Sequence, residues 1–113
     1  MVDQPRLSPP MAKIAKVMLE DPSVERYGLE VRKIAGLGTG TLYPALRRLE
    51  ALGWLTSRIE ELPPDEVRPP RRMYRLTGAG ERAARDYLAR AEERFGAAQL
   101  GAGWSANPGG AQA

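Results

Sequence analysis

The hydrophobic pattern of this chain changes its period at Gly53, and this change constrains the fold more than any other feature. Before Gly53, apolar residues recur at helical spacing on one face of a segment: Leu42, Ala45, Leu46, Leu49 and Leu52. After it, residues 54–59 have the pattern of a short strand, and residues 73–76 have that of its partner. Prolines, which cannot donate to a strand ladder, lie between them at positions 63, 64, 69 and 70. The sequence therefore predicts a helix followed by a long hairpin.

Capping residues and apolar spacing predict the other helices. Ser8, followed by two prolines, begins a helix that ends near Asp21. A second helix is expected over residues 27–35, with three apolar side chains turned inward: Leu29, Val31 and Ile34. The helix before Gly53 begins at Thr39 or Thr41. Thr77 caps a last helix that reaches about Phe95.

This order of elements is typical of a winged helix-turn-helix. We expect a mainly α fold with a two-stranded β wing, followed by a C-terminal dimerisation helix. Residues 1–7 are expected to be a flexible arm, 8–76 the DNA-binding domain, 77–96 the dimerisation helix and 97–113 a flexible Gly/Ala-rich tail. A chain of 113 residues buries only a small core, so a partner subunit would add stability.

The composition excludes several classes of protein. The chain has no cysteine and no histidine, which argues against zinc sites, disulfides, thiol nucleophiles and histidine-based catalysis. We therefore expect no enzyme, no metal and no cofactor. The net charge is +3, and 14 of the 17 basic residues are arginine, which permits binding to nucleic acid. A GC-rich genome would produce the same arginine bias. No apolar run approaches the roughly 20 residues of a membrane span, and a cytoplasmic protein is expected.

The outer face of the helix before Gly53 carries the first candidate site. Opposite its apolar stripe lie small, hydroxyl and cationic residues: Thr39, Gly40, Thr41, Tyr43, Pro44, Arg47 and Arg48. Arginine can read guanine in a major groove, hydroxyl groups can bind phosphates, and the helix N-terminus offers free N–H groups. This set predicts a DNA-recognition helix. The alternative is an ordinary solvated face with two surface arginines.

Four arginines of the hairpin form the second candidate site: Arg68, Arg71, Arg72 and Arg75. Arginines on a wing typically contact phosphate or the minor groove. Asp65 and Glu66 lie in the same loop, so its tip is not uniformly basic. The alternative is a charged strand edge that deters aggregation.

The sequence resembles the PadR family of bacterial transcription regulators over about residues 11–95. The most specific match is the run Gly40-Thr41-Leu42-Tyr43-Pro44 with Leu46, Leu49 and Gly53. The pair Tyr27-Gly28, the strand Arg71-Arg72-Met73-Tyr74-Arg75-Leu76-Thr77 and Gly80 also match. The resemblance implies a homodimeric winged-helix protein that binds double-stranded DNA, usually as a repressor, in the short form with one C-terminal helix. The wing tip, residues 62–70, is longer and more proline-rich than is usual in the family.

The resemblance also implies that the C-terminal helix packs against the partner's N-terminal region. The last helix carries an apolar stripe of Ala84, Tyr87, Leu88, Ala91 and Phe95, and the first helix would contribute Met11, Ile14 and Met18. Packing within one subunit is the alternative reading of the stripe. Tyr87 and Phe95 could line a site for a small aromatic effector between the terminal helices, although core packing suits both better. A protein-interaction module that retains the fold without binding DNA is a further alternative. Trp104, in the tail, has no assigned role.

Overall fold

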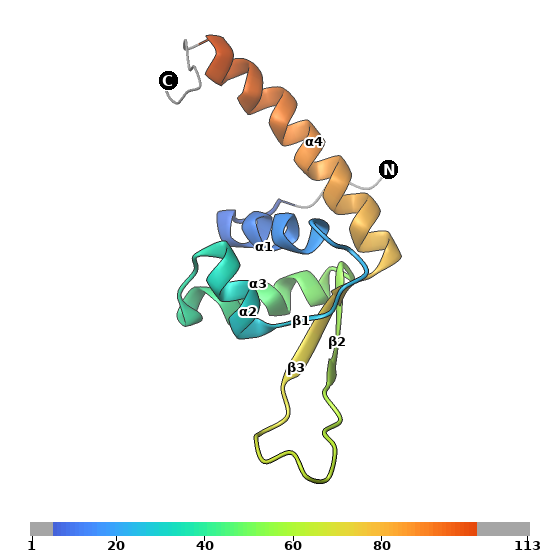
Figure 1. Cartoon of the computed structure of the whole chain (residues 1–113). Helices are drawn as coiled ribbons and strands as arrows, with labels where there is room; N and C mark the ends of the chain where they lie inside the picture. The colour runs from blue at the N-terminus through green and yellow to red at the C-terminus, as the bar shows by residue number, and fades with distance from the viewer. Residues whose placement is uncertain (1–5, 102–113) are drawn as a thin grey trace.

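The computed structural model describes residues 6–101, and the side chains as far as Glu93. The elements in this range are α1 (Pro9–Leu19), β1 (Arg26–Tyr27), α2 (Gly28–Ala35), α3 (Thr39–Ala51), β2 (Leu55–Ile59), β3 (Arg72–Leu76) and α4 (Gly78–Gly101). Helices α1, α2 and α3 form a group from which the β2–β3 hairpin extends on one side and α4 on the other (Figure 1). The predicted winged helix-turn-helix with one long C-terminal helix is confirmed.

The core lies between the first three helices. Its fully buried large side chains come from all of them: Ile14, Met18, Val31, Leu42, Leu46 and Leu49. Trp54, Tyr74 and Leu76 close the core on the side of the hairpin. The predicted apolar stripe of α3 is confirmed except at Leu52, which follows the last helical residue and is 42% exposed. The core thus fixes α3 along one face and leaves its opposite face open.

The helix boundaries follow from their capping residues. The Ser8 hydroxyl accepts a hydrogen bond from the Met11 amide at 3.3 Å, as the sequence predicts for the start of α1. Gly36 after α2 and Gly53 after α3 have φ values of 71° and 80°, which side chains other than glycine rarely adopt. These two residues reverse the chain directly after each helix.

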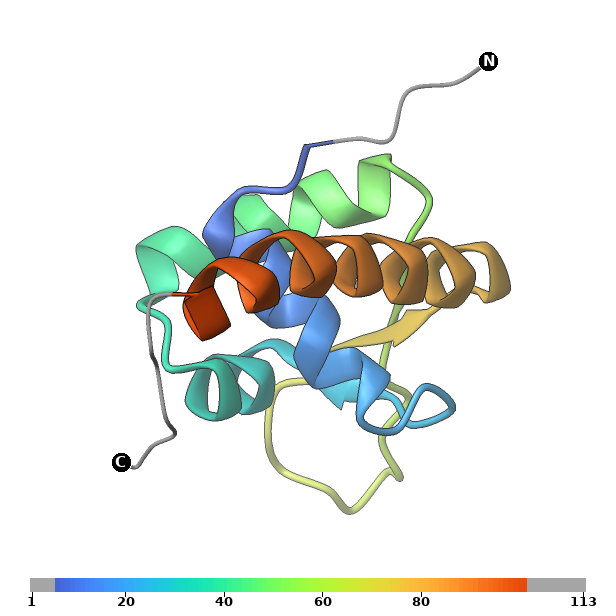
Figure 2. The same ribbon diagram turned by 90° about the horizontal axis from the view of Figure 1, so that it is seen from above.

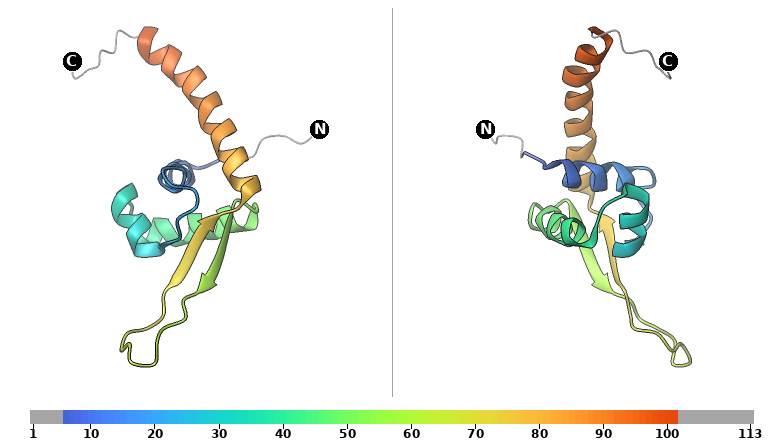
Figure 3. Two further views of the ribbon diagram at one scale, coloured as in Figure 1. Left: turned by 45° about the vertical axis from the view of Figure 1, so that its right-hand side comes forward. Right: turned by 90° about the vertical axis from the view of Figure 1, so that its left-hand side faces the viewer.

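The predicted two-stranded wing, β2 and β3, is confirmed, and a third strand, β1, extends it into a three-stranded sheet. Its order is β1-β3-β2, and both pairs are antiparallel. Leu55 pairs with Leu76 and Ile59 with Arg72, while Arg26 of β1 pairs with Tyr74. The sequence did not predict β1, because two residues are too short for an alternating pattern. This strand ties the start of α2 to the wing, and the rest of the hairpin projects away from the helices (Figure 3).

Helix α4 begins against Gly53 and Trp54, which lie between α3 and β2, then crosses α1 and extends beyond the domain. The Thr77 hydroxyl accepts a hydrogen bond from the Gly80 amide at 2.8 Å, so the predicted cap is confirmed. A β-carbon at Gly80 would overlap the carbonyl oxygen of Trp54, so only glycine permits this close approach. Seen from above, α4 runs across α1 (Figure 2). It continues to Gly101 instead of ending near residue 96.

Two predicted sets of side chains lie elsewhere than expected. Leu29 and Ile34 are each 47% exposed, because α2 is short and packs through a narrow face centred on Val31. Four residues assigned to dimerisation are at most 4% exposed within the single chain: Met11, Ile14, Met18 and Ala84. They pack in the chain's own core where α4 crosses α1 and leave little surface for a partner, so their contribution to a dimer interface stays a prediction. Tyr87, Leu88 and Ala91 are half-buried, and the side chain of Phe95 lies outside the described part.

Candidate nucleic-acid interface

The outer face of α3 presents most of its predicted recognition residues to solvent. Thr39, Gly40 and Thr41 form its first turn and are exposed. The Thr41 and Leu42 amides both donate to the Gly38 carbonyl, at 3.1 and 2.9 Å. The earlier amides, of Thr39 and Gly40, precede the first helical hydrogen bond and point outward from the helix end. This end of α3 can therefore donate hydrogen bonds to an anion.

Tyr43 is held in place by a glycine of α2. An added β-carbon at Gly28 would lie 2.9 Å from Tyr43 Cε1 and 3.1 Å from the Tyr43 hydroxyl oxygen. The phenol ring therefore rests directly on the backbone at the start of α2. Pro44 follows it and is half-buried, within the first two turns of the helix. Sequence reasoning assigned Tyr43 to the site but did not identify Gly28 as its support.

The two arginines of α3 are both exposed, but they face different neighbours. Arg47 lies near the wing, close enough for its charge to act on Tyr74. Burial raises the pKa of Tyr74, while the charges of Arg72 and Arg47 lower it. Arg48 lines a shallow depression with Arg6 and Leu52, away from the wing. Arg47 is therefore the arginine of this helix that lies beside the wing residues.

A chain of hydrogen bonds joins the wing to α3. Arg72 donates from Nη1 to Ser57 Oγ at 3.1 Å, and Ser57 donates to Glu50 Oε2 at 2.7 Å. Arg71, which directly precedes β3, places its guanidinium 4.2 Å from the centroid of the Tyr27 ring, which is a cation–π contact. Arg71 and Arg72 thus both stand at the base of the wing, next to α2 and α3.

The structure does not bring the other two wing arginines to this surface. Arg68 makes two hydrogen bonds to the Glu60 carboxylate, at 2.9 and 3.0 Å, and one to Glu66 at 3.3 Å. The hydrogen bonds from Arg68 lower the pKa of Glu60 to about 2. Arg75 lies on the opposite face of β3 from Tyr74 and Leu76, near Glu25. Arg68 folds the tip back on itself, and Arg75 faces away from α3.

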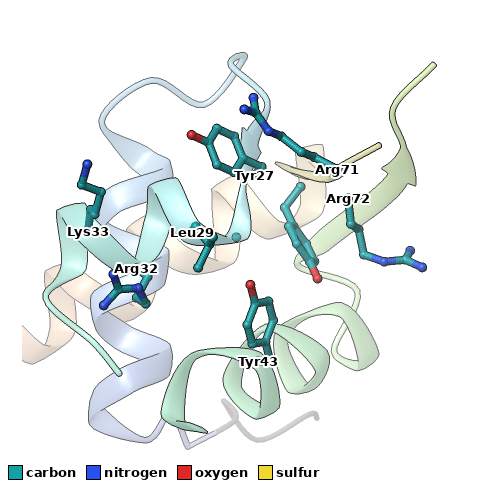
Figure 4. A pocket seen from close by; sticks show the side chains of 9 residues that line it. Tyr27, Leu29, Arg32, Lys33, Tyr43, Arg71 and Arg72 are labelled. Carbon is teal, nitrogen blue, oxygen red and sulfur yellow. The ribbon is translucent and has the colours of Figure 1, made fainter. Parts of the chain in front are cut away.

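The residues that converge form a groove of about 500 Å³ between β1, α2, α3 and the base of the wing. Nine residues line it: Tyr27, Gly28, Leu29, Arg32, Lys33, Tyr43, Arg71, Arg72 and Tyr74. Figure 4 shows Tyr43 pointing from α3 into the space between α2 and the wing, with the cationic residues around its edge. None of the nine is acidic. Among the described side chains, none of its four cations forms an ion pair. The groove is suited to bind an anion.

Sequence reasoning missed Arg32 and Lys33 as part of this surface. Arg32 donates to the Leu37 carbonyl at 3.3 Å, and its Nε is buried without a hydrogen-bond partner in the structure. On a sequence, both residues are ordinary polar positions of a short helix. Only β1, which sets α2 beside the wing, turns them toward the same groove as Arg71 and Arg72. Glu50 and Ser57 were also missed, because the hydrogen bonds that join them to Arg72 run across three elements and leave no local pattern in the sequence.

No helix in the described part of the chain is both long and apolar enough to cross a membrane. Within the same residues, no group of acidic side chains is arranged to hold a metal ion.

Comparison with known proteins agrees with this geometry. The model of the transcriptional regulator PadR-like family matches residues 22–86, which include α2, α3 and the wing. No curated protein matches the chain. A solved PadR-like transcription factor from Bacteroides fragilis is 29% identical, with a TM-score of 0.60 over 80% of this chain and 88% of that one. The protein smu.1704 from Streptococcus mutans UA159 is 28% identical, with a TM-score of 0.57 over 75% and 80% of the two chains.

A more distant structure shares the fold. NadR, solved in complex with 4-hydroxyphenylacetate, is 20% identical, with a TM-score of 0.58 over 82% of this chain. The chain spans 61% of NadR, which is less than two thirds of its length. The family match covers more than half of the 113 residues and describes regulators of transcription that are not enzymes.

Proposed function

Because this chain belongs to the PadR-like family of transcriptional regulators, we propose that it binds double-stranded DNA in a sequence-specific manner. The proposed protein is a homodimeric repressor in the cytoplasm. Each subunit inserts α3 into a major groove of a palindromic operator, and the wing contacts the flanking backbone. Occupancy of a promoter would then exclude RNA polymerase.

The observation that carries this proposal is the groove between α2, α3 and the wing. Its four cations lack ion pairs among the described side chains and lie beside the outer face of α3. A duplex offers phosphates next to base edges, so a surface that combines a polar helix face with adjacent cations matches it. Arg47 is exposed on the middle of α3 and is the residue proposed to read a base.

Dimerisation is supported by α4. Tyr87, Leu88 and Ala91 are half-buried in the single chain, on a helix that extends well beyond the domain (Figure 1). A second subunit packed on this helix would cover the remaining apolar surface. Two-fold symmetry would then place the two α3 helices about 34 Å apart, which is one turn of a duplex.

Control by a small aromatic effector is the second part of the proposal. It is supported by the shared fold of NadR, which was solved with 4-hydroxyphenylacetate. A site between the terminal helices receives no specific support from Tyr87, because this ring packs against the chain's own core.

The test of DNA binding begins with selection of bound fragments from genomic DNA by the purified full chain. Arg47→Ala and wild type are then titrated against the selected duplex and a scrambled duplex. We expect Arg47→Ala to weaken binding to the selected duplex by about 1–3 kcal/mol and to leave the scrambled duplex nearly unaffected. Equal weakening on both duplexes would mean that Arg47 contacts the DNA backbone and does not read a base. Failure to select any fragment would favour a protein-interaction module that retains the fold.

A further inference from the structure

Helix α3 carries one acidic residue that a surface for phosphate does not explain. Glu50 is the only acid of this helix and lies three residues, about one turn, after Arg47. A carboxylate beside DNA repels the phosphates, so an acid at this place on a recognition helix is expected to serve another purpose. Glu50 is half-buried, and its carboxylate accepts the hydrogen bond from Ser57 of β2. The contacts of Glu50 are therefore with the wing.

The strand register brings Ser57 and Arg72 together on one face of the sheet. Ser57 lies opposite Tyr74 in the β2–β3 pair, and Arg72 is two residues before Tyr74, so the three side chains leave the same face. Such diagonal neighbours are within reach of a long side chain, and Arg72 Nη1 lies 3.1 Å from Ser57 Oγ. Burial raises the pKa of Tyr74, and the charges of Arg72 and Glu50 act on it in opposite directions, so both groups lie close to this phenol. Glu50, Ser57 and Arg72 thus form one cluster between α3 and the wing.

The chemistry of the three groups fixes the direction of their hydrogen bonds. A serine hydroxyl has one proton and two lone pairs, and a guanidinium can only donate. The Ser57 proton goes to the Glu50 carboxylate at 2.7 Å, so its lone pairs are left for Arg72. Both outer groups are charged, and hydrogen bonds to charged groups are stronger than neutral ones. Glu50 therefore orients the hydroxyl that holds Arg72.

We propose that Glu50 and Ser57 are positioning residues, which hold the Arg72 guanidinium at the groove before DNA binds. This role rests on the proposed DNA-binding function, because Arg72 is one of the groove cations assigned to phosphate. A free arginine side chain loses rotational freedom when it binds a phosphate, whereas a guanidinium that is already held loses less. Glu50 belongs to α3 and Ser57 to the wing, so the same hydrogen bonds make the two elements meet the duplex as one unit.

The first experiment follows the Arg72 side chain in the full chain without DNA. Nitrogen-15 NMR relaxation gives the order parameter of its Nε–Hε group, with the exposed Arg75 of the same strand as reference. The order parameter of Arg72 should exceed that of Arg75 in wild type and fall to the same value in Ser57→Ala. Thr56→Ala removes a hydroxyl from the other face of β2 and should leave Arg72 unchanged. Equal order parameters of Arg72 in wild type and Ser57→Ala would overturn the proposal.

The second experiment measures DNA affinity for Ser57→Ala, Arg72→Ala and the double variant. Ser57→Ala changes no charge, so a weaker affinity has to arise through another group. We expect it to weaken binding about tenfold on operator and scrambled duplex alike, and to have no further effect once Arg72 is alanine. Thr56→Ala should bind as wild type does, and Ser57→Thr, which keeps the hydroxyl and suits a strand, should bind within about twofold of it. If the effects of the two single variants multiply in the double variant, Ser57 does not act through Arg72 and the assignment is wrong.

The third experiment separates the hydrogen bond of Glu50 from its charge. Glu50→Gln and Glu50→Leu remove the same negative charge, but only glutamine keeps an oxygen that accepts from Ser57. If Glu50 only repelled DNA, both variants would bind more tightly than wild type by the same factor. A positioning role predicts instead that Glu50→Leu binds at least about fivefold more weakly than Glu50→Gln, with a lower order parameter for Arg72.

Thermal unfolding checks that both Glu50 variants are folded at the assay temperature. Equal affinities and equal Arg72 order parameters of the two folded variants would remove Glu50 from the positioning residues and overturn the proposal. If wild type bound no DNA at all, the proposed function would fail, while the NMR measurements would still decide whether Ser57 and Glu50 hold Arg72.

Discussion

Replacement of Gly28 by alanine tests whether the position of Tyr43 matters for binding DNA. The new β-carbon would lie 2.9 Å from Tyr43 Cε1, whereas ordinary contact begins at 3.4 Å, so the ring must move by about 0.5 Å (3.4 − 2.9) or swing away. Gly28 is the first residue of α2, and its φ is not in the left-handed region, so the backbone itself accepts alanine. The substitution therefore displaces one phenol without breaking the fold.

Gly28→Ala should change the stability of the fold little and the affinity for operator DNA strongly. Tyr43 is only half-buried, and alanine is favoured over glycine in helices by roughly 0.5–1 kcal/mol, so the free energy of unfolding should change by less than about 1 kcal/mol. A hydrogen bond from the phenol to a charged phosphate contributes about 1.5 kcal/mol or more. Loss of this contact in both subunits should weaken operator binding by about a hundredfold.

The assay compares Gly28→Ala with Gly78→Ala by fluorescence anisotropy on the operator and by thermal unfolding. Gly78 is likewise the first residue of a helix, but a β-carbon there meets only Arg82 Nη1, at an ordinary 3.6 Å. Gly78→Ala should bind DNA as wild type does. If folded Gly28→Ala binds within about twofold of wild type, the phenol does not make the contact assigned to it.

A substitution in α4 and a pH titration of the wing tip test two further contacts. Leu88→Glu places a charge on the apolar stripe of α4 and should give a monomer in sedimentation equilibrium; an unchanged dimer mass would remove this helix from the interface. The hydrogen bonds from Arg68 lower the pKa of Glu60 from 4.5 to about 2, so the contribution of this pair is fully present above about pH 4.5 and is lost as the pH falls toward 2. A carbon-detected NMR titration should show Glu60 still ionised at pH 3.5; titration near pH 4.5 would contradict the pairing.

The helices of the domain could be predicted because each has a local signal. Ser8 and Thr77 cap their helices as expected, and the stripe from Leu42 to Leu49 identifies the buried face of α3. The strand β1 could not be predicted, since its two residues become a strand only by pairing with β3. The inward face of α2 was assigned incorrectly at Leu29 and Ile34, because this short helix packs through a narrow face centred on Val31.

The site was predicted where it follows one helix face and missed where it depends on tertiary contacts. The exposure of Thr39, Thr41 and Arg47 follows directly from the apolar stripe opposite them. The pairing of Arg68 with Glu60 depends on how the proline-rich tip folds, which a count of arginines does not show. Arg32 and Lys33 join the groove only through the placement of α2 beside the wing.

The dependence of DNA affinity on salt tests most directly whether the groove cations bind the duplex. Six to ten phosphate contacts per dimer predict a steep linear fall of log affinity with log salt, about 0.9 for each contact. Arg72→Ala should make this slope shallower by about two, one contact in each subunit, on operator and scrambled duplex alike. Arg82→Ala removes the same charge from α4 and should leave the slope unchanged. If Arg72→Ala and Arg82→Ala have the same slope as wild type, DNA is not held by this groove.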